Sequence, residues 1–287
     1  MPDDAITHCV NRGVVGFGRL PPREQLRDVE WTAWLAGTID HGRHPRAVSS
    51  HSGVRWLAPD DLVWARDGSG HHYLGRVSGP WAIDESEEAQ NADVVHVVPC
   101  QLRHVGRDDA LPTVVSRSFR FARRLQPIAD LEGVRFSQLC WNEVSASVDY
   151  RIDLAGATLP SVLDITRLAD LLLILLQSRG WIVMGSARDR NQSAHAATLV
   201  HRETTARATL LVGTGEYPLD PRLLAKAEHG ERAFLFHREG LYSEQIADHV
   251  TRLDPAEVEA FARSNLGLMP AIIGIWLRAL DARRGYA

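Results

Sequence analysis

The chain has 287 residues, of which 45% are hydrophobic and 24% are charged, so it holds enough apolar material for a folded protein of roughly two domains. This composition excludes a disordered or fibrous chain. The formal net charge of -4 and an isoelectric point near 6.3 exclude nucleic-acid affinity that rests on bulk charge, so any such surface must be local.

The first half of the chain, from Val14 to about Val115, consists of short apolar runs separated by turn formers. A helix is expected over 22–37, where Pro22 suits a first turn. Alternation of apolar and polar residues in 61–66 and 73–77, on either side of an Asp-Gly-Ser-Gly turn, predicts a β-hairpin. This half therefore reads as a small β-barrel.

The second half has an α/β order of elements. Gly180 closes its first helix. Asp254 and Pro255 have the N-cap and first-turn pattern of the start of a helix. In chain order the expected elements are a helix over 161–179, strands over 181–184, 197–202 and 208–212, a helix over 221–229, a strand over 233–236 and a helix from 254. The domain boundaries follow as a β-rich domain over 1–130, a connector over 131–160 and an α/β domain over 161–287. The apolar last helix, 270–277, suits either a domain core or a dimer seam.

Cysteine use and hydropathy bear on compartment. Cys9, Cys100 and Cys140 lie far apart and outside any CxxC or CxxH pattern, which argues against a zinc site and a disulfide scaffold. The N-terminal sequence lacks a secretory signal, and the longest apolar run, 171–176, is far shorter than the roughly 20 residues of a membrane span. We expect a cytoplasmic protein with no membrane contact, no metal and no cofactor.

Local positive charge gathers near the middle of the chain. Six arginines stand against two aspartates between Arg103 and Arg124, directly after an acidic stretch over 84–93. The structural interpretation is that the acidic loop and the basic arm form ion pairs with each other. The functional interpretation is an arm that tracks DNA phosphates, with Ser116 and Ser118 as neutral donors. The arginines assigned to the DNA backbone are Arg117, Arg120, Arg123 and Arg124.

Aromatic side chains crowd the first half of the chain. Each alone is more often a core residue than a ligand wall. Together they allow a pocket in which a flipped or modified base is stacked between rings. The candidate base-binding residues are Trp64, Trp81, Tyr73 and Trp56. Whether Trp64 or its neighbours Val63 and Ala65 face inward is left open by the alternation.

Several histidines occur in the same half, among them His71 and His72. None has an acidic or histidine partner at a metal-ligand spacing, so they are interpreted as polar loop residues.

Segments across both halves resemble a known family. VGFG at 15–18, LVW at 62–64, YLGRV at 73–77, GPW at 79–81 and ADVVHVVPC at 92–100 resemble the N-terminal module of bacterial Mrr-like, modification-dependent (type IV) restriction proteins. In the second half, LQSRGW at 176–181, LVHRET at 199–204, FLF at 234–236 and LDPAEV at 253–258 resemble the PD-(D/E)XK nuclease domain that follows that module. The resemblance implies an α+β, two-domain fold, with a PUA/EVE-like or Mrr N-terminal-like barrel and a C-terminal α/β restriction-endonuclease-like domain.

The residues that would make the second domain a nuclease are missing. Such enzymes use carboxylates on two adjacent strands to hold Mg²⁺ and a lysine to assist the attacking water. The acidic position of the resemblance falls at Ala196, the glutamine at Leu211 and the lysine at Gly213, while the first helix offers Ala169 with Asp170 beside it. The only lysine in the chain, Lys226, falls in the next expected helix.

The sequence therefore favours a DNA-binding protein that senses modified or foreign DNA in bacterial defence and carries a catalytically inactive nuclease-like domain. A homodimer and a separate effector protein are the further partners considered. One alternative is a divergent Mg²⁺-dependent endonuclease whose active site has moved to residues such as Asp189, His195, Glu203 or Glu216. A second alternative is a protein-interaction module built on the same tryptophans and arginines.

Overall fold

The computed structural model describes residues 3–18, 57–120, 125–188, 194–216, 218–219, 232–242 and 249–284. The chain has the mixed α+β class expected from its sequence, and its elements gather into two compact units, Met1–Ile152 (unit 1) and Asp153–Ala287 (unit 2). The division falls inside the range 131–160 that the sequence analysis assigned to a connector. Each unit holds one five-stranded sheet. Within the described parts of the chain, no helix is both long enough and apolar enough to cross a membrane.

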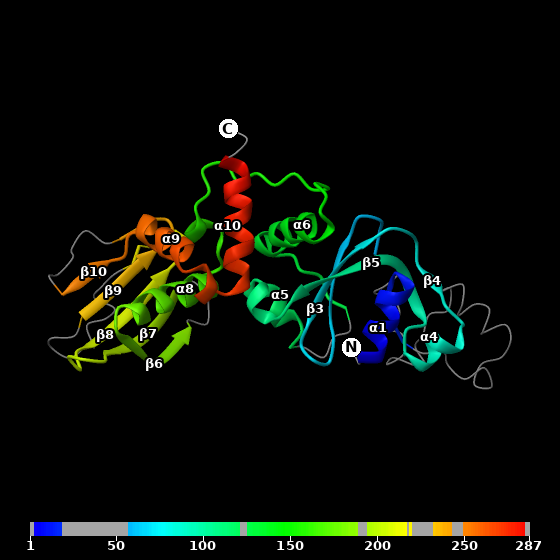
Figure 1. The fold of residues 1–287 in the computed structure, drawn as a ribbon, viewed down its shortest axis with the longest axis horizontal. Helices are drawn as coiled ribbons and strands as arrows, with labels where there is room; N and C mark the ends of the chain where they lie inside the picture. Colours follow the sequence, from blue (N-terminus) through cyan, green and yellow to red (C-terminus); the bar gives the residue numbers. More distant parts are fainter. Residues whose placement is uncertain are drawn as a thin grey trace. The chain divides into compact units, whose positions relative to one another are not determined.

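Unit 1 is built around a sheet that curls into a half-barrel (Figure 1). Its elements are α1 (Asp3–Arg12), β1 (Val14–Phe17), β2 (Leu62–Arg66), β3 (His72–Val77), β4 (Ala82–Ile83), α4 (Glu87–Asn91), β5 (His96–Gly106), the 3-10 helix η3 (Asp108–Ala110), α5 (Thr113–Ser118) and α6 (Leu131–Ser145). The strands run antiparallel in the order β1-β5-β3-β2, and β4 also pairs with β5. The first half of β5 pairs with β1 and β4 and its second half with β3, so this one long strand closes the curve.

The predicted hairpin is confirmed as β2 and β3, which pair from Leu62 opposite Arg76 to Arg66 opposite His72. Gly70 has a φ of 84° in the connecting turn, a backbone conformation that glycine adopts at little cost.

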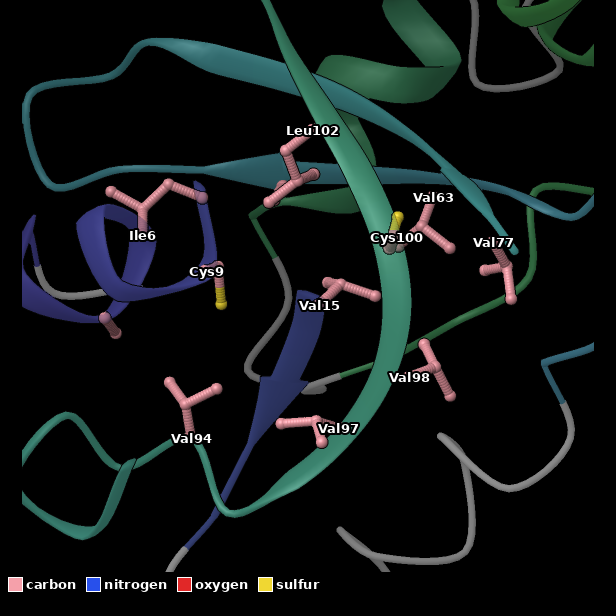
Figure 2. Packing of buried hydrophobic residues seen from close by; sticks show 12 residues of the cluster. Ile6, Cys9, Val15, Val63, Val77, Val94, Val97, Val98, Cys100 and Leu102 are labelled. Atoms are coloured by element: carbon pink, nitrogen blue, oxygen red, sulfur yellow. The ribbon is translucent and has the colours of Figure 1, made fainter. Parts of the chain in front are cut away.

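The core of the half-barrel lies between the concave side of the sheet and helix α1 (Figure 2). Figure 2 shows Val97, Val98, Cys100 and Leu102 along the curved β5, with Ile6 and Cys9 on α1. All three cysteines of the chain are buried free thiols. Burial raises the pKa of the Cys9 thiol to about 11 and that of the Cys100 thiol to about 12. On α6, burial likewise raises the pKa of the Cys140 thiol to about 12.

The expected connector begins with an ordered helix. Asp130 caps α6 by accepting a hydrogen bond from the backbone N–H of Gly133, and Ala146 ends it in the left-handed conformation. The residues that α6 buries are Gly133, Phe136, Ser137, Cys140 and Trp141. This is the i, i+3, i+4, i+7, i+8 spacing of a helix with one buried face. The helix packs on β3 and β5 and so belongs to unit 1.

Unit 2 combines a mixed sheet with four α-helices among its described residues (Figure 1). Its elements are α7 (Leu159–Val162), α8 (Ile165–Ser178), β6 (Trp181–Arg188), β7 (Ala194–His201), β8 (Arg207–Gly213), β9 (Arg232–His237), β10 (Val250–Arg252), α9 (Pro255–Ser264), the 3-10 helix η5 (Leu266–Leu268) and α10 (Ala271–Arg284). The strand order is β10-β9-β8-β7-β6. Strands β6, β7 and β8 form an antiparallel meander, whereas β8, β9 and β10 are parallel.

The helices of unit 2 begin and pack largely as their sequences predict. Helix α8 lies against β6, β7 and β8 and buries a leucine-rich face. The Asp254 side chain accepts a hydrogen bond from Ala256 N–H, with Pro255 in the first turn, so the predicted N-cap is confirmed. Helix α10 buries Ile272, Ile273 and Trp276 within the chain, which makes this face part of a core. The helices expected over 22–37 and 221–229 lie outside the described residues.

Candidate functional site

The burial of the residues in β2 shows which of them face the core. Val63 and Ala65 are buried in the half-barrel core, so Trp64 faces the opposite side of the sheet. There its indole N–H donates a hydrogen bond of 2.8 Å to the Ser137 hydroxyl on α6, which itself donates to the Gly133 carbonyl. Trp64 therefore links the sheet to α6, and its indole N–H is already hydrogen-bonded within unit 1.

The other candidate rings lie on the core side of the sheet. Tyr73 and Trp81 both pack against the half-barrel cluster. The Trp81 ring stacks on the His96 ring, with centroids 5.9 Å apart and planes 12° apart. Trp56 lies outside the described residues. The four residues expected to form one base-binding pocket are thus divided, because Trp64 and Tyr73 face opposite sides of the hairpin.

A row of rings that was not predicted from the sequence lies where β3 begins and β5 ends. The His104 ring lies 5.4 Å, centroid to centroid, from both the Tyr73 ring and the His71 ring, edge to face in each case. His104 is exposed and the His71 side chain is 33% exposed. We call His71, Tyr73 and His104 the ring row. No local signal in the sequence reveals this cross-strand pair, because it depends on the register between β3 and β5.

Asp67 holds the near end of the ring row in place. Its carboxylate accepts a 2.7 Å hydrogen bond from the backbone N–H of His71 and lies 3.4 Å from the His71 ring. Burial alone would raise the pKa of Asp67, but the His71 N–H and the nearby His71 ring lower it overall. The turn therefore carries a fixed carboxylate beside an accessible imidazole.

The basic segment is folded where the structure describes it. Arg103 is exposed on β5, Arg117 is half-buried on α5, and Arg120 is exposed just after α5. Arg123 and Arg124 lie outside the described residues. The segment is anchored by buried residues of its own, including Leu111, Pro112 and Val115.

Two details of the basic segment differ from expectation. The hydroxyls of Ser116 and Ser118 donate to the carbonyls of Thr113 and Val115, so they satisfy α5 and do not reach outward. In the acidic stretch, Asp84 pairs with Arg12 of α1 at 3.6 Å, which is a partner outside the basic segment.

In unit 2, the three positions aligned with nuclease residues lie together at one end of the sheet. Ala196 on β7 is directly opposite Leu211 on β8, and Leu211 is directly opposite Leu235 on β9. These side chains form an apolar cluster with Leu219, Tyr242 and Val250. A Cβ atom placed on Gly213 would lie 2.7 Å from Leu219 Cδ2 and 3.0 Å from His237 Cδ2, so the space that a lysine would need is filled.

Polar groups surround this cluster but bond mainly to one another. The His237 ring is fully buried, its Nδ1 accepts from the Glu239 backbone N–H, and its own backbone N–H donates to the Tyr242 hydroxyl. A Glu239 carboxylate oxygen accepts from Gly215 N–H at 3.0 Å, and the Arg252 guanidinium lies 4.4 Å from the centre of the Tyr242 ring. The sequence analysis singled out none of these residues, which come from three separate segments.

The residues considered for a relocated nuclease site are described only in part, and Glu203 and Glu216 are both exposed. Glu203 is exposed at the β7–β8 turn beside Arg202, and Ala169 is buried while Asp170 pairs with Arg167. Asp189 lies outside the described residues, and His195 lies on β7, where only the backbone is described. Among the residues that the structure describes, no three histidine, cysteine or acidic side chains are grouped so as to hold a metal ion.

No protein-family model matches the chain, and no curated protein and no solved structure matches it either. Inferences about function therefore rest on the residues and geometry described above.

Proposed function

We propose that the chain binds duplex DNA through unit 1, that it senses modified or foreign DNA in bacterial defence, and that unit 2 is a nuclease-like domain without catalytic activity. The observation that carries the proposal is the ring row where β3 begins and β5 ends. It presents two accessible imidazole rings and a half-buried phenol ring. Exposed arginines are near it in sequence: Arg103 directly precedes His104 on β5 and points to the other face of that strand, and Arg120 follows α5.

Each part of this surface suits one aspect of DNA recognition. Arginines bind phosphates through charge and paired N–H groups, and this contribution does not depend on base sequence. Rings stack on bases, and the polar atoms of histidine and tyrosine can read a base edge. We assign Arg103 and Arg120 to phosphate contacts, and His104 with Tyr73 to base contacts, in place of Trp64.

The inactive assignment for unit 2 is supported by what occupies the aligned positions. A site for Mg²⁺ needs oxygen ligands that converge on one point. Here the neighbouring strands contribute Ala196, Leu211 and Leu235 to one apolar cluster, and Leu219 closes the space above Gly213. The antiparallel meander followed by a parallel strand agrees with the restriction-endonuclease-like fold that we propose for this unit.

The test is a titration of one duplex in unmodified, methylated, hydroxymethylated and phosphorothioated forms, at several salt concentrations with Mg²⁺ present. We expect salt-sensitive binding without cleavage. Replacing Arg103 and Arg120 together by alanine should flatten the slope of log K against log salt by about twice 0.9. The matched control replaces the exposed Arg202 and Arg207 of unit 2 and should leave the slope unchanged.

The base-reading role is tested in the same titration with His104→Ala. Loss of one stacking ring should reduce the preference among the four duplex forms by about 1 kcal/mol while leaving the salt slope intact. Mg²⁺-dependent cleavage would contradict the inactive assignment, and absence of binding to every form would contradict DNA recognition.

A protein-interaction role is the second candidate, and one observation favours it. Strand β6 forms an edge of the sheet in unit 2, and it exposes Ile182 to 50% and Met184 to 66%. Exposed apolar side chains on an edge strand are suited to pairing with another chain. Binding of a protein partner that is insensitive to salt, and that Ile182→Lys abolishes, would support this role over DNA recognition.

A further inference from the structure

A buried histidine in unit 1 has a role that the proposed function does not use. His72 is the first residue of β3, directly opposite Arg66 and Gly106 on the neighbouring strands, and its side chain is fully buried. The sequence analysis placed it in a loop, and that prediction is wrong. Neither of its ring nitrogens has a hydrogen bond of good geometry within the described parts of the chain.

Two elements that follow β5 close over the His72 ring. On η3, a carboxylate oxygen of Asp108 lies 3.3 Å from His72 Nε2, and the Asp108 side chain is 63% exposed. At the end of α5, the Phe119 ring meets the imidazole edge to face, with centroids 5.1 Å apart. The Arg66 guanidinium lies 5.5 Å from the centre of the same Phe119 ring.

The charges around His72 come from three elements. Burial lowers the pKa of His72, and the Arg66 guanidinium on β2 also lowers it. The Asp108 carboxylate on η3, the Gly106 backbone on β5 and Asp67 in the β2–β3 turn raise it, while α5 contributes the uncharged Phe119 ring. The net direction is downward from the ordinary histidine value. The packed arrangement therefore favours the neutral ring.

We propose that His72 is a proton-controlled latch that holds the segment from Asp108 to Phe119 against β3 while its ring is neutral and loosens that segment when the ring takes up a proton. The geometry that carries the proposal is a fully buried imidazole without well-formed hydrogen bonds. One short stretch of chain, which contains η3 and α5, covers it. That segment includes Arg117 and is followed by Arg120. The latch is a property of unit 1 alone and does not depend on DNA binding.

The direction of the pH effect follows from linkage. A ring released to solvent has an ordinary pKa near 6.5, which is above that of the packed ring. Protons therefore bind the open state more tightly, so the latch is firm above about pH 6.5 and weakens as the pH falls through and below that value. The Asp108 carboxylate moderates this effect because it stabilises the protonated ring in place.

The experiment measures hydrogen exchange of the backbone amides from Asp108 to Ser118 at about pH 7.5 and about pH 5.5, corrected for the intrinsic pH dependence of exchange. In the native protein, we expect protection of these amides to fall several-fold at the lower pH. His72→Gln should abolish that loss, and Asp108→Asn should enlarge it. His104→Gln is the matched control, because it removes an exposed histidine of the neighbouring strand β5 and should retain the native pH effect.

Equal protection at the two pH values, or a pH effect that persists in His72→Gln, would overturn the proposal. A direct titration of the histidine rings by NMR in the unmodified protein keeps the test decisive if His72→Gln does not fold. The His72 ring should titrate below the ordinary histidine value near 6.5, and a His72 ring that titrates at or above that value would also overturn the proposal.

Discussion

The ends of the two sheets differ in what their strands leave at the surface. In unit 1, the start of β3 and the end of β5 meet at the ring row, where His104 is open to solvent and His71 is partly so. In unit 2, β7, β8 and β9 meet at an apolar cluster in which Leu211 and Leu235 are buried and Leu219 fills the space beside Gly213. The first end therefore presents accessible polar groups, whereas the second end is packed like a core.

The largest effect is expected from placing a glutamate and a lysine in the apolar cluster of unit 2. Ala196→Glu with Gly213→Lys places a long side chain against Leu219 and His237 and brings two charges into an apolar cluster. We expect a loss of more than about 3 kcal/mol in the free energy of unfolding, and no Mg²⁺-dependent cleavage. Denaturant unfolding and a plasmid cleavage assay measure the two outcomes.

The control for that experiment introduces the same two residue types elsewhere in the same sheet, on β7 and β6. Thr198 and Gly185 are exposed and directly opposite each other on β7 and β6, and a Cβ on Gly185 would contact nothing within 4 Å. Thr198→Glu with Gly185→Lys should therefore leave stability nearly unchanged. A double variant at Ala196 and Gly213 that unfolds no more easily than the native protein would show that this end of the sheet is not packed as described.

A smaller effect is expected from one methyl group in the core of unit 1. A Cβ on Gly75 would lie 2.4 Å from Cys100 Sγ and 2.9 Å from Leu102 Cδ2. Gly75→Ala should lower the free energy of unfolding by about 1–3 kcal/mol, since the close-packed core must shift to admit it. Gly185→Ala, where the added atom meets open space, is the matched comparison in a denaturant titration, and equal midpoints for the two variants would contradict the packing.

The smallest effect concerns the joint between the sheet and α6. Trp64→Phe removes the indole N–H that binds the Ser137 hydroxyl and should cost about 1 kcal/mol from this hydrogen bond. A double-mutant cycle with Ser137→Ala isolates the coupling between the two groups. A coupling energy of zero would return Trp64 to the set of rings available for base binding.

Local sequence patterns predicted the elements whose signals are strong. The hairpin of β2 and β3, the strands of unit 2 from β6 to β9, and the Asp254 N-cap are all present. Each depends on neighbours in sequence, namely alternation, a glycine-containing turn or a capping side chain.

Helix α6 was missed although its spacing is regular, because glycine and serine occupy two of its five buried positions and do not register as apolar. The ring row and the polar groups around His237 were missed for a different reason. They join residues from separate strands whose register depends on the whole sheet, and His72 became a core residue only because η3 and α5 fold back over it. Such tertiary contacts leave no trace in local periodicity.

The positions of the three cysteines have a practical consequence. All of them lie in unit 1, two in the half-barrel core and one on α6, and unit 2 has none. Because the reactive species is the thiolate, buried thiols with raised pKa values react only when the surrounding structure opens. The rate of thiol alkylation in the unsubstituted protein therefore measures how often unit 1 opens. Opening of unit 2 does not contribute to that rate.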